Sequence, residues 1–236
     1  MSTDNRPGAR APRRLGSPLT EFGHGRPVVL VWDLAEPTPK RAAGPRTSPR
    51  PAAELLVAAQ HASAESIAFT VRHGSGFVRV ALREDAADRL DLPTMYLPGL
   101  VNNPLRDTVS VDAANGATTG ISAADRALTM RLLANPDSTP HQFTRPGHVV
   151  PMRVRDVPSA GMTPAGIALA MTEALGLHSA VAMCTLVSAR DPLSMADTED
   201  GAAFAALHGI GLVRASDIAG PGHTILSHTL AAERSA

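Results

Sequence analysis

Hydrophobic positions along this chain follow two different periods, and together they predict an alternation of strands and helices. The run from Pro27 to Trp32 is short, rich in β-branched residues and bounded by Gly25 and Pro37, which is typical of a buried strand. Similar short runs, or an alternation of apolar and polar residues, predict further strands at 54–59, 77–82, 108–112, 149–154, 178–187 and 211–213.

Helices are predicted where a polar capping residue precedes apolar residues at helical spacing. Ser63 and Thr163 stand at such positions, and Ser122 with Asp125 three residues later resembles a capping box. Helices and strands mixed in this way indicate a sheet covered by layers of helices. The predicted helices cover 63–71, 122–133, 163–176 and 200–208, and a short last turn begins at Asp217.

The two ends of the chain and one internal segment lack this periodicity. Residues 1–26 are polar and rich in Arg, Pro and Gly, so we expect a disordered N-terminal arm before a single domain at 27–220. We expect 221–236 to be a loose C-terminal tail. Five prolines and four basic residues between 37 and 51 exclude a helix and predict a long basic loop, which is either a solvated insertion or part of a site.

Composition narrows the possible partners. Hydrophobic residues make up 44% of the chain and aromatic residues only 3%, so we expect a core of Ala, Val, Leu, Ile and Met. The 22 basic and 22 acidic residues balance, which favours a small-molecule ligand over nucleic acid or a membrane surface. The single cysteine, Cys184, excludes an internal disulfide and lies in a run typical of a buried strand.

The cellular location is expected to be cytoplasmic. No apolar run approaches the roughly 20 residues that a membrane span needs. The polar N-terminal residues also lack the apolar stretch of a secretory signal.

Three short segments carry candidate chemistry, and the first is Arg72-His73-Gly74-Ser75-Gly76. It places a cation, an imidazole and a hydroxyl beside two glycines, whose backbone can approach a ligand closely. The alternative is a tight connection between a helix and a strand.

The other two segments lie downstream. Thr118–Gly120 precedes a capped helix and offers hydroxyl and N–H groups to a phosphate or a carboxylate, unless these groups only complete the cap. Arg145–His148 places a cation and an imidazole at a rigid turn, where His148 can act as acid or base, although a structural turn is the alternative. The sequence contains neither a nucleotide-binding glycine loop nor Cys and His residues at zinc spacing.

In this order and spacing, the three segments resemble the signature of the 3,4-dihydroxy-2-butanone 4-phosphate synthase family. The similarity extends from about Pro27 to Ile218 and includes the run from Leu90 to Pro93. It implies an α+β fold, a three-layer mixed sheet with helices on both faces, and a homodimer whose sites lie near the subunit boundary. It also implies the formation of dihydroxybutanone phosphate and formate from ribulose 5-phosphate, with magnesium.

The chain departs from this family at three places. The resemblance places an acidic metal-binding loop after the first strand. In this chain only Asp33 and Glu36 are acidic near the start of that loop. Arg50 stands where the family has a metal-binding Glu, and Glu54 aligns with the last Asp of the loop. A family segment that supplies a phosphate-binding Arg and a metal-binding His corresponds to 161–166, which contains no Arg, His or Glu. The acid that follows the strand cysteine in the family is also replaced, by Thr.

These differences favour a repurposed, metal-independent enzyme of this fold that acts on a small polar or anionic metabolite in specialised metabolism. Lyase-like or isomerase/cyclase-like chemistry is expected, with the parent activity lost. The alternatives are a noncatalytic binding or regulatory paralogue, and a retained synthase that draws its acids from unexpected positions such as Asp33, Glu36 and Glu54.

On the preferred hypothesis His148 and His73 move protons, and neither a metal nor a cofactor takes part. We expect a homodimer without nucleic-acid or membrane partners. The expected substrate-binding residues are Arg50, Glu54, Arg72, Ser75, Thr118, Thr119, Arg145 and Thr163.

Overall fold

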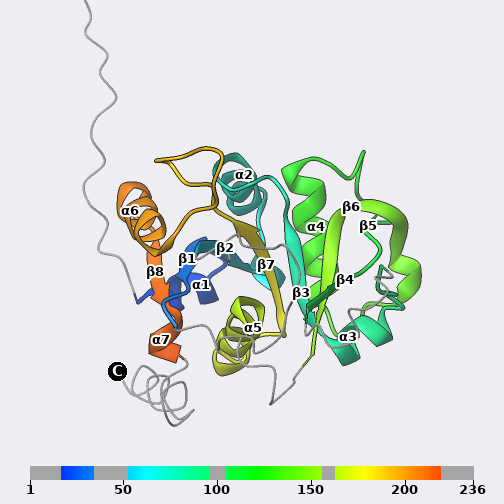
Figure 1. Ribbon diagram of the computed structural model, residues 1–236. Coiled ribbons are helices and arrows are strands. Elements are labelled where there is room, and N and C mark those ends of the chain that lie inside the picture. The colour runs from blue at the N-terminus through cyan, green and yellow to red at the C-terminus, as the bar shows by residue number, and fades with distance from the viewer. Residues whose placement is uncertain (1–16, 35–52, 96–104, 156–162, 219–236) are drawn as a thin grey trace, which may run out of the picture.

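The computed structural model describes residues 17–34, 53–95, 105–155 and 163–218, whose strands form one mixed sheet (Figure 1). The strand order is β4-β6-β3-β7-β2-β1-β8, and β5 pairs with β6. Pairs β1–β8 and β3–β6 are parallel and the others are antiparallel. The strands are β1 Val28–Val31, β2 Ala53–Ala58, β3 Arg79–Arg83, β4 Leu105–Asp107, β5 Val111–Ala113, β6 Phe143–Val154, β7 Ala180–Thr185 and β8 Gly211–Arg214.

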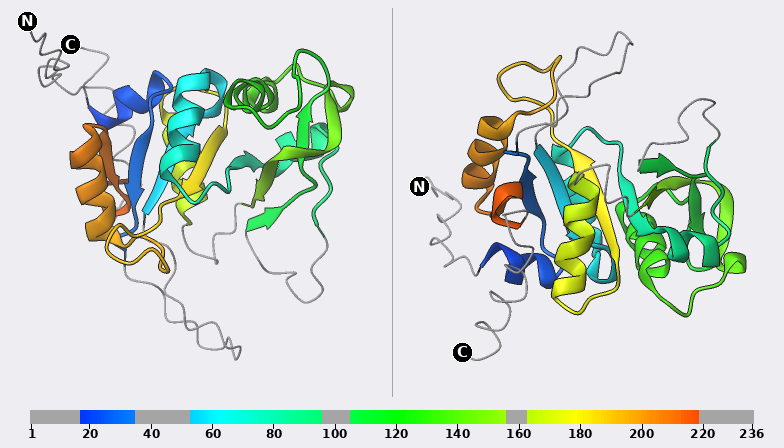
Figure 2. Two further views of the ribbon diagram at one scale, coloured as in Figure 1. Left: turned by 90° about the horizontal axis from the view of Figure 1, so that it is seen from above. Right: turned by 60° about the horizontal axis from the view of Figure 1, so that its bottom comes forward.

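Helices cover both faces of the sheet, which confirms the predicted α+β arrangement (Figure 2). α2, α4 and α6 pack on one face, where Ile67 and Ala127 join the larger core cluster. α1, α5 and α7 pack on the other face with Phe22 and Ile167. The helices are α1 Pro18–Gly23, α2 Ala64–His73, α3 Glu84–Arg89, α4 Ala123–Ala134, α5 Pro164–Ala174, α6 Thr198–His208 and α7 Ala215–Ile218, with 3₁₀ turns at Ala59–His61 and Pro140–Gln142.

The predicted helix starts at Ser63, Ser122 and Thr163 are confirmed by their hydrogen bonds. Each side chain accepts a hydrogen bond from the backbone N–H three residues later, at 3.0 to 3.1 Å. The hydroxyl thereby satisfies an N–H group that has no partner within the helix. The predicted aliphatic core is also confirmed, because Phe22 and Phe143 are the only buried aromatic residues in its two clusters among the described residues.

Several expected boundaries are corrected. The N-terminal arm expected at 1–26 contains α1, whose Phe22 is fully buried against the sheet. Only the end of the strand expected at 108–112 is a strand, because β4 ends at Asp107 and β5 begins at Val111. The basic loop at 37–51 and the tail at 221–236 lie outside the described residues.

None of the helices in the described ranges is both long enough and apolar enough to span a lipid bilayer.

Replacing Phe22 by Ala should lower the free energy of unfolding by about 3 kcal/mol, because it leaves a cavity under a fully buried ring. Chemical denaturation followed by circular dichroism measures the change. Leu193→Ala is the control, since that side chain is 95% exposed and its removal should cost less than about 0.5 kcal/mol. Equal losses in the two variants would show that α1 does not contribute to the core.

Candidate functional site

The clearest candidate group centres on His148 of β6. Its ring Nδ1 lies 2.7 Å from Oδ2 of Asp112, and its backbone N–H donates to Oδ1 of the same carboxylate at 2.9 Å. The His148 side chain is 43% exposed, whereas that of Asp112 is only 10% exposed. Nε2 of His148 has no hydrogen-bond partner among the described residues, so it is the ring nitrogen left for a ligand.

A loop fixed by Asp125 lies directly against this pair. The Asp125 carboxylate accepts hydrogen bonds from the N–H and hydroxyl of Thr118 at 3.1 and 2.8 Å, and from the N–H of Gly120 at 3.1 Å. The hydrogen bond from the Thr118 hydroxyl is the main cause of the lowered pKa of Asp125. Gly120 has φ +82°, and a Cβ there would overlap Oδ2 of Asp112 and lie 2.8 Å from Nδ1 of His148.

The same contacts separate the expected roles of the two threonines. Both polar groups of Thr118 are already engaged by Asp125, so the structure does not leave them free for a substrate anion as expected. Thr119 is exposed, and no other described residue hydrogen-bonds to its hydroxyl. Thr119 is therefore the residue of this loop whose side chain is open to a ligand.

The guanidinium of Arg145, which was expected to bind an anion, donates hydrogen bonds to backbone carbonyl groups. Its guanidinium donates to the carbonyl oxygens of Leu90 and Asp91 at 2.8 and 3.2 Å. Further donations reach the carbonyls of Pro140 and Phe143 at 3.3 and 3.4 Å. Because these four oxygens occupy its donors, Arg145 ties the start of β6 to the turn after α3.

A second group centres on Glu54 of β2. Oε1 of this buried carboxyl accepts a hydrogen bond from the Thr185 hydroxyl at 3.0 Å and lies 3.8 Å from Nη2 of Arg79. Oε2 is buried without a hydrogen-bond partner. Burial raises the pKa of Glu54, although the charge of Arg79 and the Thr185 hydrogen bond act in the opposite direction.

Ser75 and Cys184 border this second group. The Ser75 N–H donates to the carbonyl of Thr185 at 2.8 Å, and its hydroxyl lies 3.6 Å from the Cys184 sulfur. A Cβ on Gly74 would overlap that sulfur, so the turn requires glycine here for the close approach. Burial raises the pKa of the Cys184 thiol, which confirms the prediction of a buried strand thiol.

His73, expected to move protons, lies between α2 and α6, and its role in proton transfer stays a prediction. Its ring lies 4.6 Å from the Phe69 ring, 4.5 Å from the His208 ring and 5.9 Å from the Phe204 ring, measured between centroids. Burial, followed by the charges of His208 and Arg72, lowers the pKa of His73. His73 therefore packs α2 against α6 in a stack of four rings.

The remaining expected site residues are dispersed. Thr163 caps α5 through Gly166, and Arg72 is exposed on the last turn of α2. Asp33 accepts hydrogen bonds from the N–H and hydroxyl of Ser216 at 2.8 and 2.6 Å, next to the start of α7. Arg50 and Glu36 lie outside the described residues.

The two groups lie on one sheet and are separated by two strands. Glu54 on β2 pairs with Thr185 on β7, and β3 follows in the strand order before β6. Arg79 of β3 pairs with Val150, which is two residues after His148. At the usual strand spacing, Glu54 and His148 are about 14 Å apart along the sheet, within reach of the two ends of one extended small molecule.

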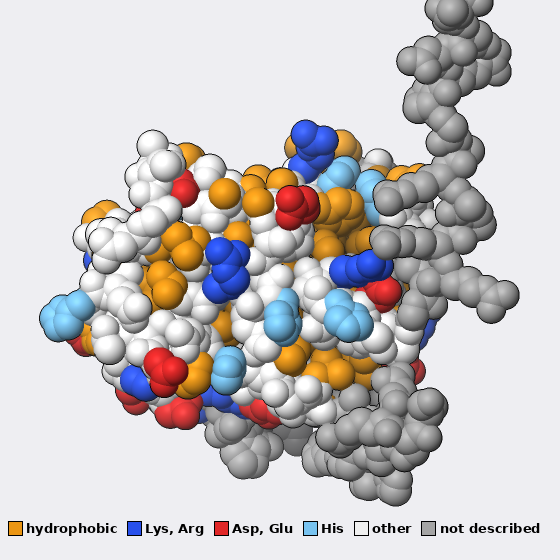
Figure 3. All heavy atoms as spheres, turned by 180° about the vertical axis from the view of Figure 1, so that it is seen from behind, with side chains coloured by type: hydrophobic (Ala, Val, Ile, Leu, Met, Phe, Trp, Pro, Cys, Tyr) orange, Lys and Arg blue, Asp and Glu red, His pale blue; other side chains and the backbone are white. Residues whose placement is uncertain are grey.

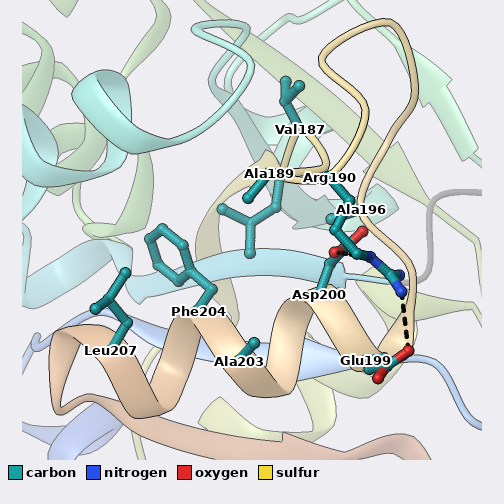
Figure 4. Close-up of a pocket in the computed structure, with 10 residues that line it drawn as sticks. Val187, Ala189, Arg190, Ala196, Glu199, Asp200, Ala203, Phe204 and Leu207 are labelled. Atoms are coloured by element: carbon teal, nitrogen blue, oxygen red, sulfur yellow. Dashed lines mark hydrogen bonds and ion pairs between the residues drawn. The ribbon is translucent and has the colours of Figure 1, made fainter.

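A separate pocket of about 220 Å³ lies between α6 and the segment 186–196 (Figure 4). Arg190 at its rim donates to Asp200, Glu199 and Asp197 at 2.7, 2.9 and 2.5 Å, so its charge is matched by carboxylates. Neither His148 nor Glu54 lines this pocket.

On the face drawn in Figure 3, acidic and basic side chains are scattered, in line with the zero net charge.

The described residues do not fit a magnesium site. Magnesium prefers several oxygen ligands, usually carboxylates with water. Within the four described ranges, no three His, Cys, Asp or Glu side chains come together in a way that could hold a metal ion. The Glu54 carboxyl lies beside the Arg79 guanidinium, a position that disfavours a second cation.

Two residues that matter here were not singled out from the sequence. Asp112 supports His148 from 36 positions away, and Arg79 reaches Glu54 across β7. Both contacts depend on which strands are neighbours in the sheet. The alternation of apolar and polar residues marks a strand but does not identify its neighbour, so the sequence contained no local signal for either contact.

The Glu54→Gln variant should gain stability relative to the parent protein as the pH rises above 4.5, the ordinary pKa of Glu. The unfolded chain loses its Glu54 proton first, so the parent loses stability as the pH rises through the higher pKa of the folded state. Gln stays neutral and has no such loss. Melting temperatures measured from acid to neutral pH should give a variant-minus-parent difference that increases with pH.

Glu173→Gln is the matched control with the opposite sign. Partial burial opposes the shift, but hydrogen bonds from Arg83 and Ser179 lower the pKa of Glu173. Its contribution to stability is therefore present above 4.5 and lost as the pH falls, so the variant-minus-parent difference should decrease with rising pH. A Glu54 difference that is flat or falls with pH would contradict the burial argument.

The chain is similar to riboflavin biosynthesis enzymes. Residues 49–220 match the family model described as 3,4-dihydroxy-2-butanone 4-phosphate synthase. The riboflavin biosynthesis proteins RibBA of Mycobacterium ulcerans and Mycobacterium tuberculosis are each 45% identical to it over 168 residues, which is 70% of this chain. The alignment covers 39% of each relative, so this chain spans well under half of their length.

Solved structures share its fold. A 3,4-dihydroxy-2-butanone 4-phosphate synthase of Candida albicans is 34% identical with a TM-score of 0.68, and the match covers 83% of this chain and 90% of that one. A synthase crystallised in complex with two magnesium ions is 32% identical with a TM-score of 0.67, over the same shares of the two chains.

These relationships overturn the expectation of a repurposed, metal-independent enzyme of specialised metabolism. Relatives at 45% identity are named for riboflavin biosynthesis, and the similar structures are synthases. The segments shared with the family therefore indicate its function more strongly than the differences from it indicate a new one. The chain belongs to the 3,4-dihydroxy-2-butanone 4-phosphate synthase family.

Proposed function

We propose that this chain carries out the family reaction, the conversion of ribulose 5-phosphate to 3,4-dihydroxy-2-butanone 4-phosphate and formate, in riboflavin biosynthesis. The observation that carries the proposal is the Asp112–His148 pair beside the Gly120 loop. These residues lie within the stretch that matches the family model. The five carbons of the substrate divide between a four-carbon ketone and formate, so no further reactant is consumed overall.

His148 is the proposed acid and base of this reaction. Breaking carbon–carbon bonds beside carbonyl groups requires protons to be removed from and returned to carbon. An imidazole can accept such a proton near neutral pH, and the imidazolium that forms can return it. The His148 side chain is 43% exposed, and its Nε2 has no hydrogen-bond partner among the described residues, so this nitrogen is the one available for them. The open hydroxyl of Thr119 is suited to hydrogen-bond the same substrate.

Glu54 and Ser75 are proposed to bind the sugar at the other end of the site. The raised pKa of Glu54 favours a protonated carboxyl, which can donate a hydrogen bond to a substrate oxygen. Its Oε2 has no partner within the protein. Thr118, Arg145, Thr163 and His73 are not included, because their polar groups or rings are engaged in the contacts described above.

The purified chain should release formate from ribulose 5-phosphate, and His148→Ala should lower kcat/KM roughly 10²- to 10⁴-fold. Formate is measured with a coupled dehydrogenase, both with added magnesium and with a chelator, so that the metal requirement is determined directly. His178→Ala is the control, because His178 is exposed just before β7, at the end of the strand opposite Thr185. Absence of formate in both arms, or full activity of His148→Ala, would refute the proposal.

We also propose a homodimer in which a second copy covers apolar side chains beside the site. Phe77 is 54% exposed with its ring 6.0 Å from the Arg79 guanidinium, and Ile121, which follows Gly120, is 57% exposed. Apolar side chains left exposed beside a polar site are typical of an interface.

Light scattering after size-exclusion chromatography should give about twice the chain mass of 24.5 kDa. Ile121→Glu should shift the protein toward the monomer, since it places a charge in an apolar contact. Leu193→Glu, on a side chain that is 95% exposed and away from His148, should leave the mass unchanged. A monomeric parent protein would contradict the proposed dimer.

A further inference from the structure

Asp112 makes two hydrogen bonds to a single residue. Oδ1 accepts a hydrogen bond from the backbone N–H of His148 at 2.9 Å, and Oδ2 lies 2.7 Å from the ring Nδ1, within hydrogen-bond distance. One contact fixes the backbone of His148 and the other fixes the rotation of its ring. A carboxylate that bonds both groups leaves the imidazole one favoured orientation.

The same contact determines which ring nitrogen carries the proton. An ionised carboxylate accepts hydrogen bonds and does not donate them, so a neutral His148 must keep its hydrogen on Nδ1. The lone pair then lies on Nε2, the nitrogen without a partner in the described part of the chain. Asp112 thus makes the exposed nitrogen the basic one.

Asp112 is itself held from two sides. It belongs to β5, which pairs with β6, and the next residue, Ala113, donates its N–H to the Thr129 hydroxyl of α4 at 2.9 Å. The Thr129 hydroxyl in turn donates to the carbonyl of Asp125 at 3.0 Å. The residue that fixes the Gly120 loop is therefore also connected to the strand that carries Asp112.

Gly120 provides the space for this arrangement. A side chain at this position would overlap the Asp112 oxygen that receives the ring hydrogen bond. The positive φ of +82° also favours glycine. The loop can therefore lie against the Asp112–His148 pair only while residue 120 has no Cβ.

We propose that Asp112 is a positioning residue, which holds His148 in the Nδ1–H tautomer with Nε2 directed to the substrate, and that Gly120 is required for this contact. The inference builds on the proposed synthase function, but its central claim concerns the state of His148 without substrate. It can therefore be tested even if the proposed reaction is wrong.

Nitrogen NMR of the full chain labelled at histidine should show His148 as the Nδ1–H tautomer at a pH where free imidazole is neutral. The His148→Gln variant assigns the signal among the nine histidines. Asp112→Asn offers one acceptor oxygen to two donors, so the Nδ1–H fraction should fall and kcat should drop roughly a hundredfold with little change in KM. An Nε2–H signal in the parent protein, or an unchanged tautomer in Asp112→Asn, would overturn the proposal.

Gly120→Ala tests the same contact without changing a polar atom. It should reduce the Nδ1–H fraction as Asp112→Asn does. Gly116→Ala is the matched control, because Gly116 has nearly the same φ of +81° but its added Cβ would meet only the flexible end of Leu128, at 3.2 Å. Both variants carry the backbone strain, so an equal effect on the His148 signal would show that strain, and not the loss of space beside Asp112, is responsible.

Discussion

The pairing of β6 with three other strands is the constraint on which the candidate site depends. Its first half pairs with β5, and its last residues pair with β3 along one edge and β4 along the other. His148 lies close to the point where these pairings change. Its position is therefore determined by strand pairing across the sheet. The residues before it, Arg145 to Gly147, were expected to form a turn but belong to β6 itself.

Much of the fold could be predicted because its signals are local. The strand runs and the caps at Ser63, Ser122 and Thr163 act over a few neighbouring residues, and the structure reproduces them. α1 and α3 were not predicted, since each has six residues and a single buried side chain, Phe22 or Ala87. A helical period cannot be recognised from one buried position.

The candidate site could be predicted only as a set of segments. The sequence identified the turns around Gly120 and His148 but assigned free polar groups to Thr118 and Arg145, whose partners are Asp125 and four backbone carbonyls. The functional hypothesis failed for a related reason. It took the absence of an acid at one sequence position as the loss of a carboxylate from the site. A carboxylate on a neighbouring strand can lie at the same place in space, as the carboxyl of Glu54 lies beside Thr185 and accepts a hydrogen bond from its hydroxyl.

The helix α1 has a consequence for how the protein is handled. Phe22 shares a core cluster with Val28 and Leu30 of the first strand and with Val213 of the last described strand. A shortened expression version starting at Pro27, where the hydrophobic pattern begins, would leave these strand residues uncovered and prone to aggregate. Affinity tags and fusion partners are better joined ahead of Ser17, so that α1, which covers this side of the sheet, stays intact.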